Sequence, residues 1–397
     1  MTSGRIKRLA KRIGDNDSSC RLDRLEIKAG ALLEAAEYLE SRNFRSVVIA
    51  ADKATHEAAG AVLEKRIARA GLSVASETIK PNGRLDVIAD EASIIQLLLA
   101  VQKHGADCIV AAGGGTIHDI ARYAAYTAGI PFVSVPTAPS VDGFNSKGAP
   151  IIVRGEKITI PALGPDALFA DLDILVRAPK PLIAAGFGDM LGKFTSLFDW
   201  KFGARIGGEP YMEESAAITR SALEYCIDRA ELIAAGGEEG VHALMSALVE
   251  SGLAMLLFGK SHPASGAEHH LSHYWEMEYI RTGRRQLLHG AKVGAACAEI
   301  SGLYRSIAER GPDVWRANET ESKERLALLD GWEFVASEIR SIPEPDQLKE
   351  WLALVGGPVS PAELGIEPEL LERSLREAHR VRMERYTLLR AYNEGAL

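Results

Sequence analysis

Short apolar runs alternate with longer amphipathic stretches over the first 180 residues. The apolar runs are rich in β-branched residues and end at turn residues, as strands do. The segments between them have the 3.6-residue period of helices, at residues 54–71 and 91–104. This alternation predicts βαβ units and a parallel sheet. The expected strands are "RSVVIAAD" (Arg45 to Asp52), "LSVASETI" (72–79), "DCIVAAGGG" (107–115) and "PFVSVPT" (131–137).

The pattern changes near Pro179 and Pro181. Strand-like pieces occur before this point, in "PIIVRGEKITI" and "LFADLDIL", and the chain is helical almost to the end after it. Two prolines at the change mark a boundary. We therefore expect a Rossmann-like α/β domain that binds a dinucleotide at residues 1–180 and an all-α domain at residues 181–397. The active site is expected in the cleft between them.

Composition narrows the class of protein. The chain has 397 residues, enough for two domains, and a formal net charge of −8. An acidic chain is a poor nucleic-acid binder, because phosphate backbones are held by clustered Lys and Arg. The basic opening "GRIKRLAKRI" (Gly4 to Ile13) is expected to be a solvated helix face, with an interaction arm as the alternative.

The cysteines and the hydropathy pattern indicate a compartment. Cys20, Cys108, Cys226 and Cys297 are scattered without CxxC spacing, so neither a disulfide framework nor a zinc knuckle is expected. We find no signal-like N-terminus and no stretch of about twenty apolar residues. The sequence therefore predicts a cytoplasmic protein that does not insert into membranes.

A run of glycines separates an expected strand from an expected helix. Gly113, Gly114 and Gly115 in "IVAAGGGTIHDIARYAA" allow a tight turn, and they let backbone N–H groups approach an anion at the helix N-terminus. By itself the run also fits a plain tight turn. Asp52, however, ends an earlier strand, where a carboxylate can accept hydrogen bonds from an adenosine ribose. We interpret the loop as a site for a dinucleotide pyrophosphate.

A second polar loop follows the strand at 131–137. Loops at this edge of an open α/β sheet are where ligands lie. The loop, "PTAPSVDGFNSKGAP" (Pro136 to Pro150), offers hydroxyls, a carboxylate and an ammonium, at Thr137, Ser140, Ser146, Asp142 and Lys147.

Histidines are concentrated in "SGAEHHLSHYWEM" (Ser265 to Met277). On a helix, His269 and His273 share one face because they are four residues apart, whereas His270 points about 100° away. We expect His270 to be a buried hydrogen-bonding residue or an outer partner of a ligand.

Two further segments complete a candidate metal site. His289 lies in "RRQLLHGAKVGAA" and Asp189 in "AAGFGDMLGKFTS". Two imidazoles and a carboxylate can hold one divalent ion, zinc, nickel or ferrous iron, and leave a position open for substrate. Taken alone, Asp189 could also be a helix N-terminal carboxylate. The set is not HExxH, so a metalloprotease is disfavoured.

The order of these motifs resembles the iron-containing alcohol dehydrogenase and 3-dehydroquinate synthase superfamily. Within it, "SVPTAPSVDGFNSKGA" together with "PASGAEHHLSHYWEM" is most similar to bacterial sn-glycerol-1-phosphate dehydrogenases. The resemblance implies a metal-dependent oxidoreductase that reduces dihydroxyacetone phosphate to sn-glycerol 1-phosphate with NADH or NADPH.

The resemblance also implies roles for residues. Asp189, His269 and His289 would bind the metal, His273 would be a further active-site histidine, and Asp142 would face substrate hydroxyls. Val141 and "SKGAP" depart from archaeal relatives, so the phosphate contact stays open among Lys147, Lys193, Arg284 and Arg285, with Lys147 favoured. The expected cofactor-binding residues are Asp52, Gly113, Gly114, Gly115, Thr116, Asp119, Thr137, Ser140 and Ser146.

Three other functions are alternatives to this one. A glycerol or other polyol dehydrogenase would use the same metal and cofactor without recognising phosphate. A 3-dehydroquinate synthase-like lyase has a different stretch around its first metal ligand, and a non-catalytic binding protein would not need every ligand type. We also expect a small-molecule substrate and a homo-oligomer, with a dimer favoured.

Overall fold

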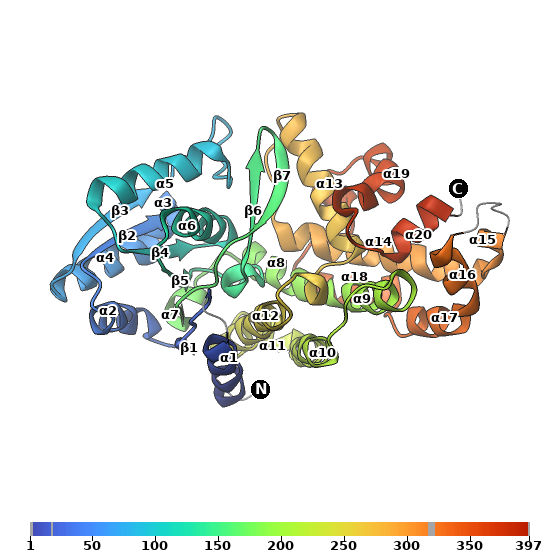
Figure 1. Cartoon of the computed structure of the whole chain (residues 1–397), viewed down its shortest axis with the longest axis horizontal. Helices are drawn as coiled ribbons and strands as arrows, with labels where there is room; N and C mark the ends of the chain where they lie inside the picture. The colour runs from blue at the N-terminus through green and yellow to red at the C-terminus, as the bar shows by residue number, and fades with distance from the viewer. Residues whose placement is uncertain (1–2, 17–18, 317–321, 396–397) are drawn as a thin grey trace.

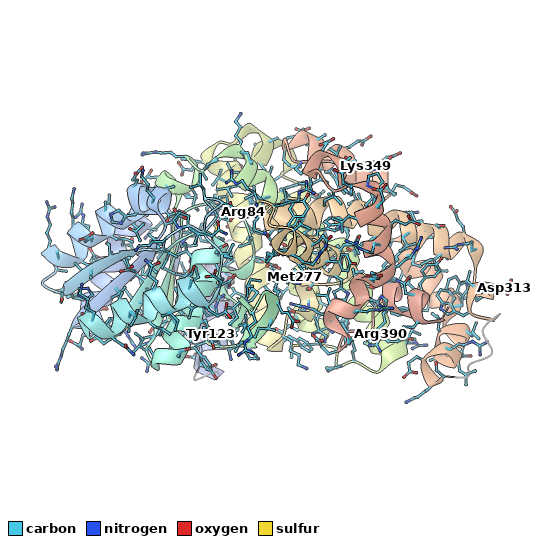
Figure 2. All side chains as sticks on the ribbon, turned by 90° about the horizontal axis from the view of Figure 1, so that it is seen from above. Arg84, Tyr123, Met277, Asp313, Lys349 and Arg390 are labelled. Atoms are coloured by element: carbon cyan, nitrogen blue, oxygen red, sulfur yellow. The ribbon has the colours of Figure 1, made fainter. Side chains whose placement is uncertain are left out.

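The computed structural model describes residues 3–16, 19–316 and 322–395. An α/β part and a helical part lie side by side along the longest axis, as Figures 1 and 2 show from two directions. The chain enters the helical part at α8, which begins at Lys180. The predicted fold class, a parallel sheet followed by an all-helical region, is confirmed.

The α/β part is built on one six-stranded sheet. Its order is β1-β8-β5-β4-β2-β3, and every pair in it is parallel. The central strands are buried on both faces, which explains their continuous apolar runs. The strands are β1 (Arg24–Lys28), β2 (Ser46–Ala51), β3 (Ser73–Thr78), β4 (Cys108–Gly113), β5 (Phe132–Pro136) and β8 (Ala167–Asp171).

Helices cover both faces of this sheet. On one face α2 (Ala31–Ser41) and α4 (Ala61–Arg69) pack through residues such as Leu39 and Ile67. On the other, α5 (Glu91–His104) and α6 (Gly115–Ala128) pack through residues such as Leu97 and Ile120. Three short segments, α3 (Lys53–Thr55), η1 (His56–Gly60) and α7 (Leu172–Leu175), follow strands β2 and β8.

Sequence analysis overlooked the edge strand β1. Three of its five residues, RLEIK, are charged, and only Leu25 and Ile27 are buried. The basic opening segment forms α1 (Ser3–Asn16), which buries Ile6, Ala10 and Ile13 against the core shared with α12. Its basic residues include Lys7 and Arg12, which form ion pairs with Glu26 and Glu214.

The helical part has its own apolar core. Trp275, Tyr304 and Trp315 are among its large buried side chains. Its helices are α8 (Lys180–Leu191), α9 (Lys193–Gly207), α10 (Glu213–Ile227), α11 (Ala230–Ala235), α12 (Glu238–Phe258), α13 (Ala267–Arg281), α14 (His289–Arg310), α15 (Asp313–Arg316), α16 (Lys323–Asp330), α17 (Trp332–Arg340), α18 (Pro345–Leu354), α19 (Pro368–Glu377) and α20 (Leu388–Gly395), with short turns η3 (His262–Ala264), η4 (Ala362–Leu364) and η5 (Ala378–Arg382).

An antiparallel hairpin connects the two parts. Strands β6 (Gly148–Val153) and β7 (Glu156–Pro161) follow the short turn η2 (Gly143–Asn145) and stand beside α13 in Figure 1. Lys157 on β7 pairs with Glu276 on α13 at 2.9 Å. The hairpin thus belongs to the α/β part in sequence and contacts the helical part in space.

Helix α12 bears on the expectation that the chain has no apolar stretch long enough to span a membrane. Among the described residues it alone is long and apolar enough to cross a membrane, and 83% of its most apolar window is buried inside the protein. A core helix has the same length and composition, so α12 is weak evidence for a membrane span.

Candidate active site

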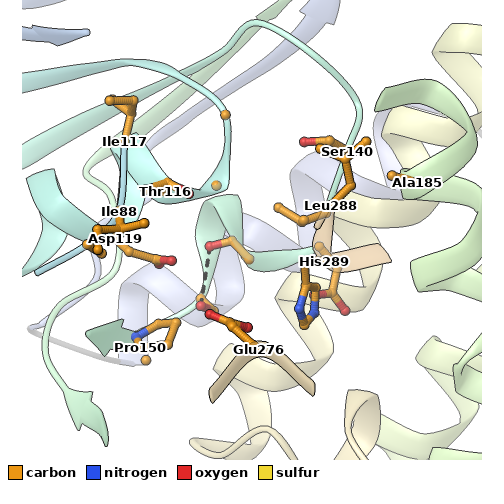
Figure 3. A pocket seen from close by; sticks show the side chains of 18 of the residues that line it. Ile88, Thr116, Ile117, Asp119, Ser140, Pro150, Ala185, Glu276, Leu288 and His289 are labelled. Atoms are coloured by element: carbon orange, nitrogen blue, oxygen red, sulfur yellow. Dashed lines mark hydrogen bonds between the residues drawn. The ribbon is translucent and has the colours of Figure 1, made fainter. Parts of the chain in front are cut away.

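One cavity of about 1450 Å³ runs between the two parts. Its walls come from the carboxyl ends of the strands, from the β6–β7 hairpin and from α13, α14 and η5. Figure 3 shows Thr116 and Asp119 on one side of it and His289 and Glu276 on the other. The expected site residues that line it are Asp52, Gly114, Gly115, Thr116, Asp119, Thr137, Ser140, Asp142, Ser146, Lys147, His269, His273 and His289.

The glycine loop presents the N-terminus of α6 to the cavity. Gly114 precedes the helix, and no side chain caps it, so N–H groups of the first turn are free to meet a ligand. A Cβ on Gly114 would meet no atom within 4 Å, whereas one on Gly113 would lie 2.7 Å from Ile117. Gly113 therefore serves the close packing of strand on helix, and Gly114 leaves open the space that a pyrophosphate needs.

The second loop is held against α6 by a buried arginine. Arg122 donates to the carbonyl oxygens of Gly143 at 2.5 Å and Gly148 at 3.0 Å, and it pairs with Asp119 at 2.7 Å. Burial raises the pKa of Asp119 to about 7, against the effect of Arg122. Ser146 donates its hydroxyl to the Gly143 carbonyl at 3.3 Å. Asp52 lies farther along the cavity and caps α3 through Thr55 N–H at 2.8 Å.

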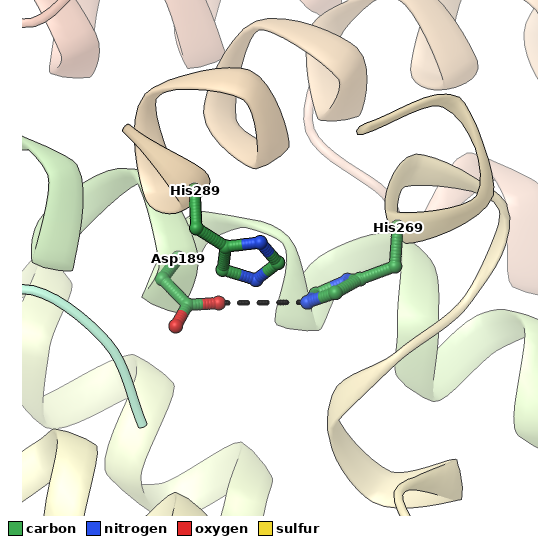
Figure 4. Close-up of side chains that lie close together, drawn as sticks. All are labelled: Asp189, His269 and His289. Atoms are coloured by element: carbon green, nitrogen blue, oxygen red, sulfur yellow. Dashed lines mark ion pairs between the residues drawn. The ribbon is translucent and has the colours of Figure 1, made fainter. Parts of the chain in front are cut away.

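Asp189, His269 and His289 come together from three helices. One donor atom from each lies within 4.8 Å of the others, and Figure 4 shows the carboxylate facing both imidazoles. Nε2 of His269 is 3.6 Å from Oδ1 of Asp189. One carboxylate and two imidazoles suit a divalent transition metal with an open position, so the residues present fit the metal that their types predict.

Backbone contact sets the distance between two of these helices. Gly188 precedes Asp189 on α8, and Gly290 follows His289 on α14. A Cβ on Gly188 would lie 2.4 Å from the Gly290 carbonyl oxygen, and one on Gly290 would lie 1.8 Å from that of Ala185. Only glycines allow this approach, so they fix the distance between the carboxylate and the imidazole.

A buried lysine sits behind the candidate metal site. Lys193 lies 3.1 Å from Asp189 and 2.8 Å from Asp142. Burial opposes its charge, but the two carboxylates outweigh that effect and raise the pKa of Lys193. Ser251 also donates to Asp142, at 2.7 Å.

Glu268 orients His269 from the outside. Its Oε1 is 2.7 Å from Nδ1 of His269, and its Oε2 accepts the Thr195 hydroxyl at 2.6 Å. A carboxylate on Nδ1 leaves Nε2 free for a metal and makes the imidazole a stronger ligand. Despite its burial, these bonds lower the pKa of Glu268. Sequence analysis assigned no role to Glu268, because a single carboxylate beside a histidine does not show which ring nitrogen it contacts.

His273 and His270 have different surroundings. The His273 ring lies 6.2 Å from that of His269 and 6.0 Å from that of His289, and it lines the cavity. His270 is fully buried, and neither of its ring nitrogens has a hydrogen-bond partner among the described residues. Burial lowers the pKa of both histidines well below the ordinary range.

The four basic residues considered for phosphate fall in different places. Lys147 lines the cavity, and Lys193 is engaged by Asp142 and Asp189. Arg284 lies over the Tyr279 ring, while Arg285 pairs with Asp86 on the surface. Neither of these two arginines lines the cavity.

Several cavity residues escaped sequence reasoning. Lys157 and Lys292 each lie 2.9 Å from Glu276, and Arg382 and Arg385 come from the far end of the chain. Single basic residues in a long chain give no local signal, and only the fold brings them together.

Comparisons with known proteins extend the resemblance. A family described as iron-containing alcohol dehydrogenase matches residues 26–179. Two relatives named glycerol-1-phosphate dehydrogenase [NAD(P)+] are those of Geobacillus thermodenitrificans, 44% identical over 100% of this chain and 98% of the relative, and Bacillus subtilis, 41% identical over 98% and 96%. The enzyme of that name from Pyrococcus furiosus is 36% identical over 70% of this chain and 69% of its own.

Solved structures agree on the fold. A probable glycerol dehydrogenase from Sinorhizobium meliloti superposes with a TM-score of 0.67 at 20% identity, covering 93% of this chain and 91% of that one. Identity this low speaks for the fold alone. The near full-length relatives, found at 41–44% identity, carry the assignment further. The chain therefore belongs to the glycerol-1-phosphate dehydrogenase [NAD(P)+] family of oxidoreductases, within the iron-containing alcohol dehydrogenases.

Proposed function

We propose that the protein reduces dihydroxyacetone phosphate to sn-glycerol 1-phosphate, reversibly, with NADH or NADPH. The observation that carries this proposal is the Asp189–His269–His289 cluster, whose two histidines line the same cavity as the uncapped N-terminus of α6. Relatives named for this activity support the choice of substrate.

One wall of the cavity would bind the cofactor, and the opposite wall would bind the metal. The first-turn N–H groups of α6 would hold the cofactor pyrophosphate, and Asp52 would accept hydrogen bonds from the adenosine ribose. Thr116, Thr137, Ser140 and Ser146 would surround the rest of the cofactor. When bound at Asp189, His269 and His289, a zinc, nickel or ferrous ion would polarise the substrate oxygen while reduced nicotinamide supplies hydride to C2.

Two further residues would handle the substrate. His273 faces the cavity and would accept a proton at one ring nitrogen while giving one from the other to the new hydroxyl oxygen. Oδ1 of Asp142 would accept a hydrogen bond from a substrate hydroxyl, because Oδ2 is engaged by Lys193 and Ser251. Lys147 would lie beside the substrate from the second loop.

A coupled assay of metal-loaded protein tests this function. We expect kcat/KM for dihydroxyacetone phosphate to exceed that for dihydroxyacetone by roughly a hundredfold or more, because phosphate adds charge-assisted bonds. The product should resist oxidation by a glycerol-3-phosphate dehydrogenase. Equal efficiency with the two ketones would favour a polyol dehydrogenase.

The finer points of organisation are proposals as well. The division at residue 180, the homodimer and the cytoplasmic location each stay a prediction. Limited proteolysis, analytical ultracentrifugation and cell fractionation would test them.

A further inference from the structure

The cavity extends beyond the candidate metal site into a basic end. We call it the arginine lobe and define it as Lys260, Ser261, His262, Ser265, Arg382 and Arg385, all of which line the cavity. These residues come from the end of α12, from η3 and from the segment around η5.

Arg382 has no strong partner in this lobe. Within the described ranges its guanidinium donates to three hydroxyls, those of Ser261 at 2.9 Å, Ser265 at 3.4 Å and Thr159 at 3.3 Å. Among the described residues no carboxylate forms an ion pair with it. Hydroxyls fix the position of the side chain without neutralising its charge, which leaves the planar fork available to an anion.

Arg385 has an unused donor. The residue is 2% exposed. Its Nε lies 3.3 Å from Glu209 and its Nη1 donates to the Ser265 carbonyl at 2.6 Å, whereas Nη2 makes no hydrogen bond to any residue that the structure describes. A buried guanidinium donor without an acceptor is costly. The Arg385 side chain lines the cavity, so an anion that reaches Nη2 would supply the missing acceptor.

Few negative charges compete for this place. Glu209 is already engaged by Arg385 and by the N–H of Tyr386. Glu384 lines the cavity but is exposed and forms no ion pair within the described ranges. The lobe therefore keeps a net positive charge.

The lobe adjoins the candidate metal site along the chain. Ser265, which contacts both arginines, lies four residues before His269. Its neighbour Ala264 accepts a hydrogen bond from Lys193 at 3.1 Å. In dihydroxyacetone phosphate only one methylene and one ester oxygen separate the carbonyl carbon from phosphorus, so a substrate between these places would be short and phosphorylated.

We propose that Arg382 and Arg385 form the subsite for the substrate's phosphate, and that this subsite makes the enzyme select a phosphorylated ketone. The inference rests on the proposed function and names the part of the site that recognises the substrate. Arg382 would bind the phosphate oxygens through its fork, and Nη2 of Arg385 would donate a further bond.

The test compares R382Q with R380A in the metal-loaded enzyme. Arg380 lies two residues away and is exposed, and it does not line the cavity. We expect R382Q to lose roughly 10- to 100-fold in kcat/KM for dihydroxyacetone phosphate, since each charge-assisted bond contributes about that factor. The ratio of efficiencies for dihydroxyacetone phosphate over dihydroxyacetone should fall with it, and R380A should stay within about twofold of the wild type.

A binding measurement separates this inference from the proposed function. Calorimetric titration with inorganic phosphate should show a weaker site in R382Q than in R380A, whatever the reaction. If the wild type prefers dihydroxyacetone phosphate and R382Q keeps both that preference and phosphate affinity, the subsite is wrong and the function stands. If the wild type shows no preference but phosphate binding depends on Arg382, the proposed function and the selection of substrate by this subsite are both wrong, and only an anion site at Arg382 remains. If R382Q does not fold, R382K replaces it in the same comparison, because lysine keeps the positive charge but lacks the planar guanidinium. Unchanged phosphate affinity in R382K would overturn the bidentate contact between Arg382 and phosphate.

Discussion

The backbone N–H of Asp142 donates to Oδ2 of Asp189 at 3.0 Å. This bond joins the loop after β5 to the carboxylate of the candidate metal site, so a cofactor-side segment supports a ligand on α8. Lys193 strengthens the link because it lies between the two carboxylates.

Replacing Asp142 with Asn should weaken metal binding. Without the Asp142 charge, Lys193 pairs with Asp189 alone and competes with the metal for it. We expect about 10- to 100-fold lower metal affinity, as for other outer partners of ligands, measured by competition with a chelator. D330N, at an exposed site at the end of α16, is the control. Equal affinity in D142N and D330N would contradict the link.

Loss of any one ligand should abolish metal retention and turnover together. D189A, H269A and H289A each remove one of three donors, and two donors hold a divalent ion poorly. Metal content per chain should fall below about a tenth of the wild-type value by mass spectrometry. H104A changes an exposed histidine of α5 and should retain the metal. Full activity in a ligand variant after chelation would exclude this site.

Replacing Glu268 with Gln should lower metal affinity through His269. The amide cannot supply the negative charge that Nδ1 now faces at 2.7 Å. A loss of about 10- to 100-fold is expected, whereas E299Q, at a half-buried position on α14, should bind as the wild type does. Wild-type affinity in E268Q would mean that Glu268 serves packing alone.

A side chain at Gly114 should block the cofactor and leave the fold intact. The backbone at Gly114 has φ −81°, which any residue adopts, and its Cβ position is open. G114V should raise the dissociation constant for NADH in a fluorescence titration without changing metal content. G83V, at another open glycine position, should leave the dissociation constant for NADH unchanged. Unaltered NADH binding in G114V would rule out a pyrophosphate at this turn.

Acid should destabilise the protein in part through His118. Burial lowers the pKa of His118 to about 3, below its unfolded value of about 6.5. Between these values the unfolded chain binds one more proton, so the free energy of unfolding falls as the pH falls. From pH 6.5 to 5 this group contributes a loss of about 2 kcal/mol. Urea unfolding should show a smaller difference between these pH values in H118N than in the wild type, and an equal difference would refute the assignment.

Periodicity predicted the strongest elements well. Continuous apolar runs identified β2, β4 and β5 because these strands are buried on both faces, and the expected helix at 91–104 coincides with α5. The edge strand β1 was missed because three of its five residues are charged. The proximity of Asp189, His269 and His289 was anticipated from residue types and from the family resemblance. The position of Arg382 and Arg385 in the cavity could not be anticipated, because it depends on how the last segments of the chain fold back on η3.

The contact between Gly188 and Gly290 has a consequence for the choice of metal. Two of the three donors are mounted on helices that touch through their backbones, and the third, His269, is oriented by a side-chain bond to Glu268. The distance between the first two donors, Asp189 and His289, is therefore fixed by the helix backbones. Small differences in ionic radius would be accommodated by rotation of the His269 imidazole. Selection among similar ions would then be tuned by what surrounds His269, without moving a helix.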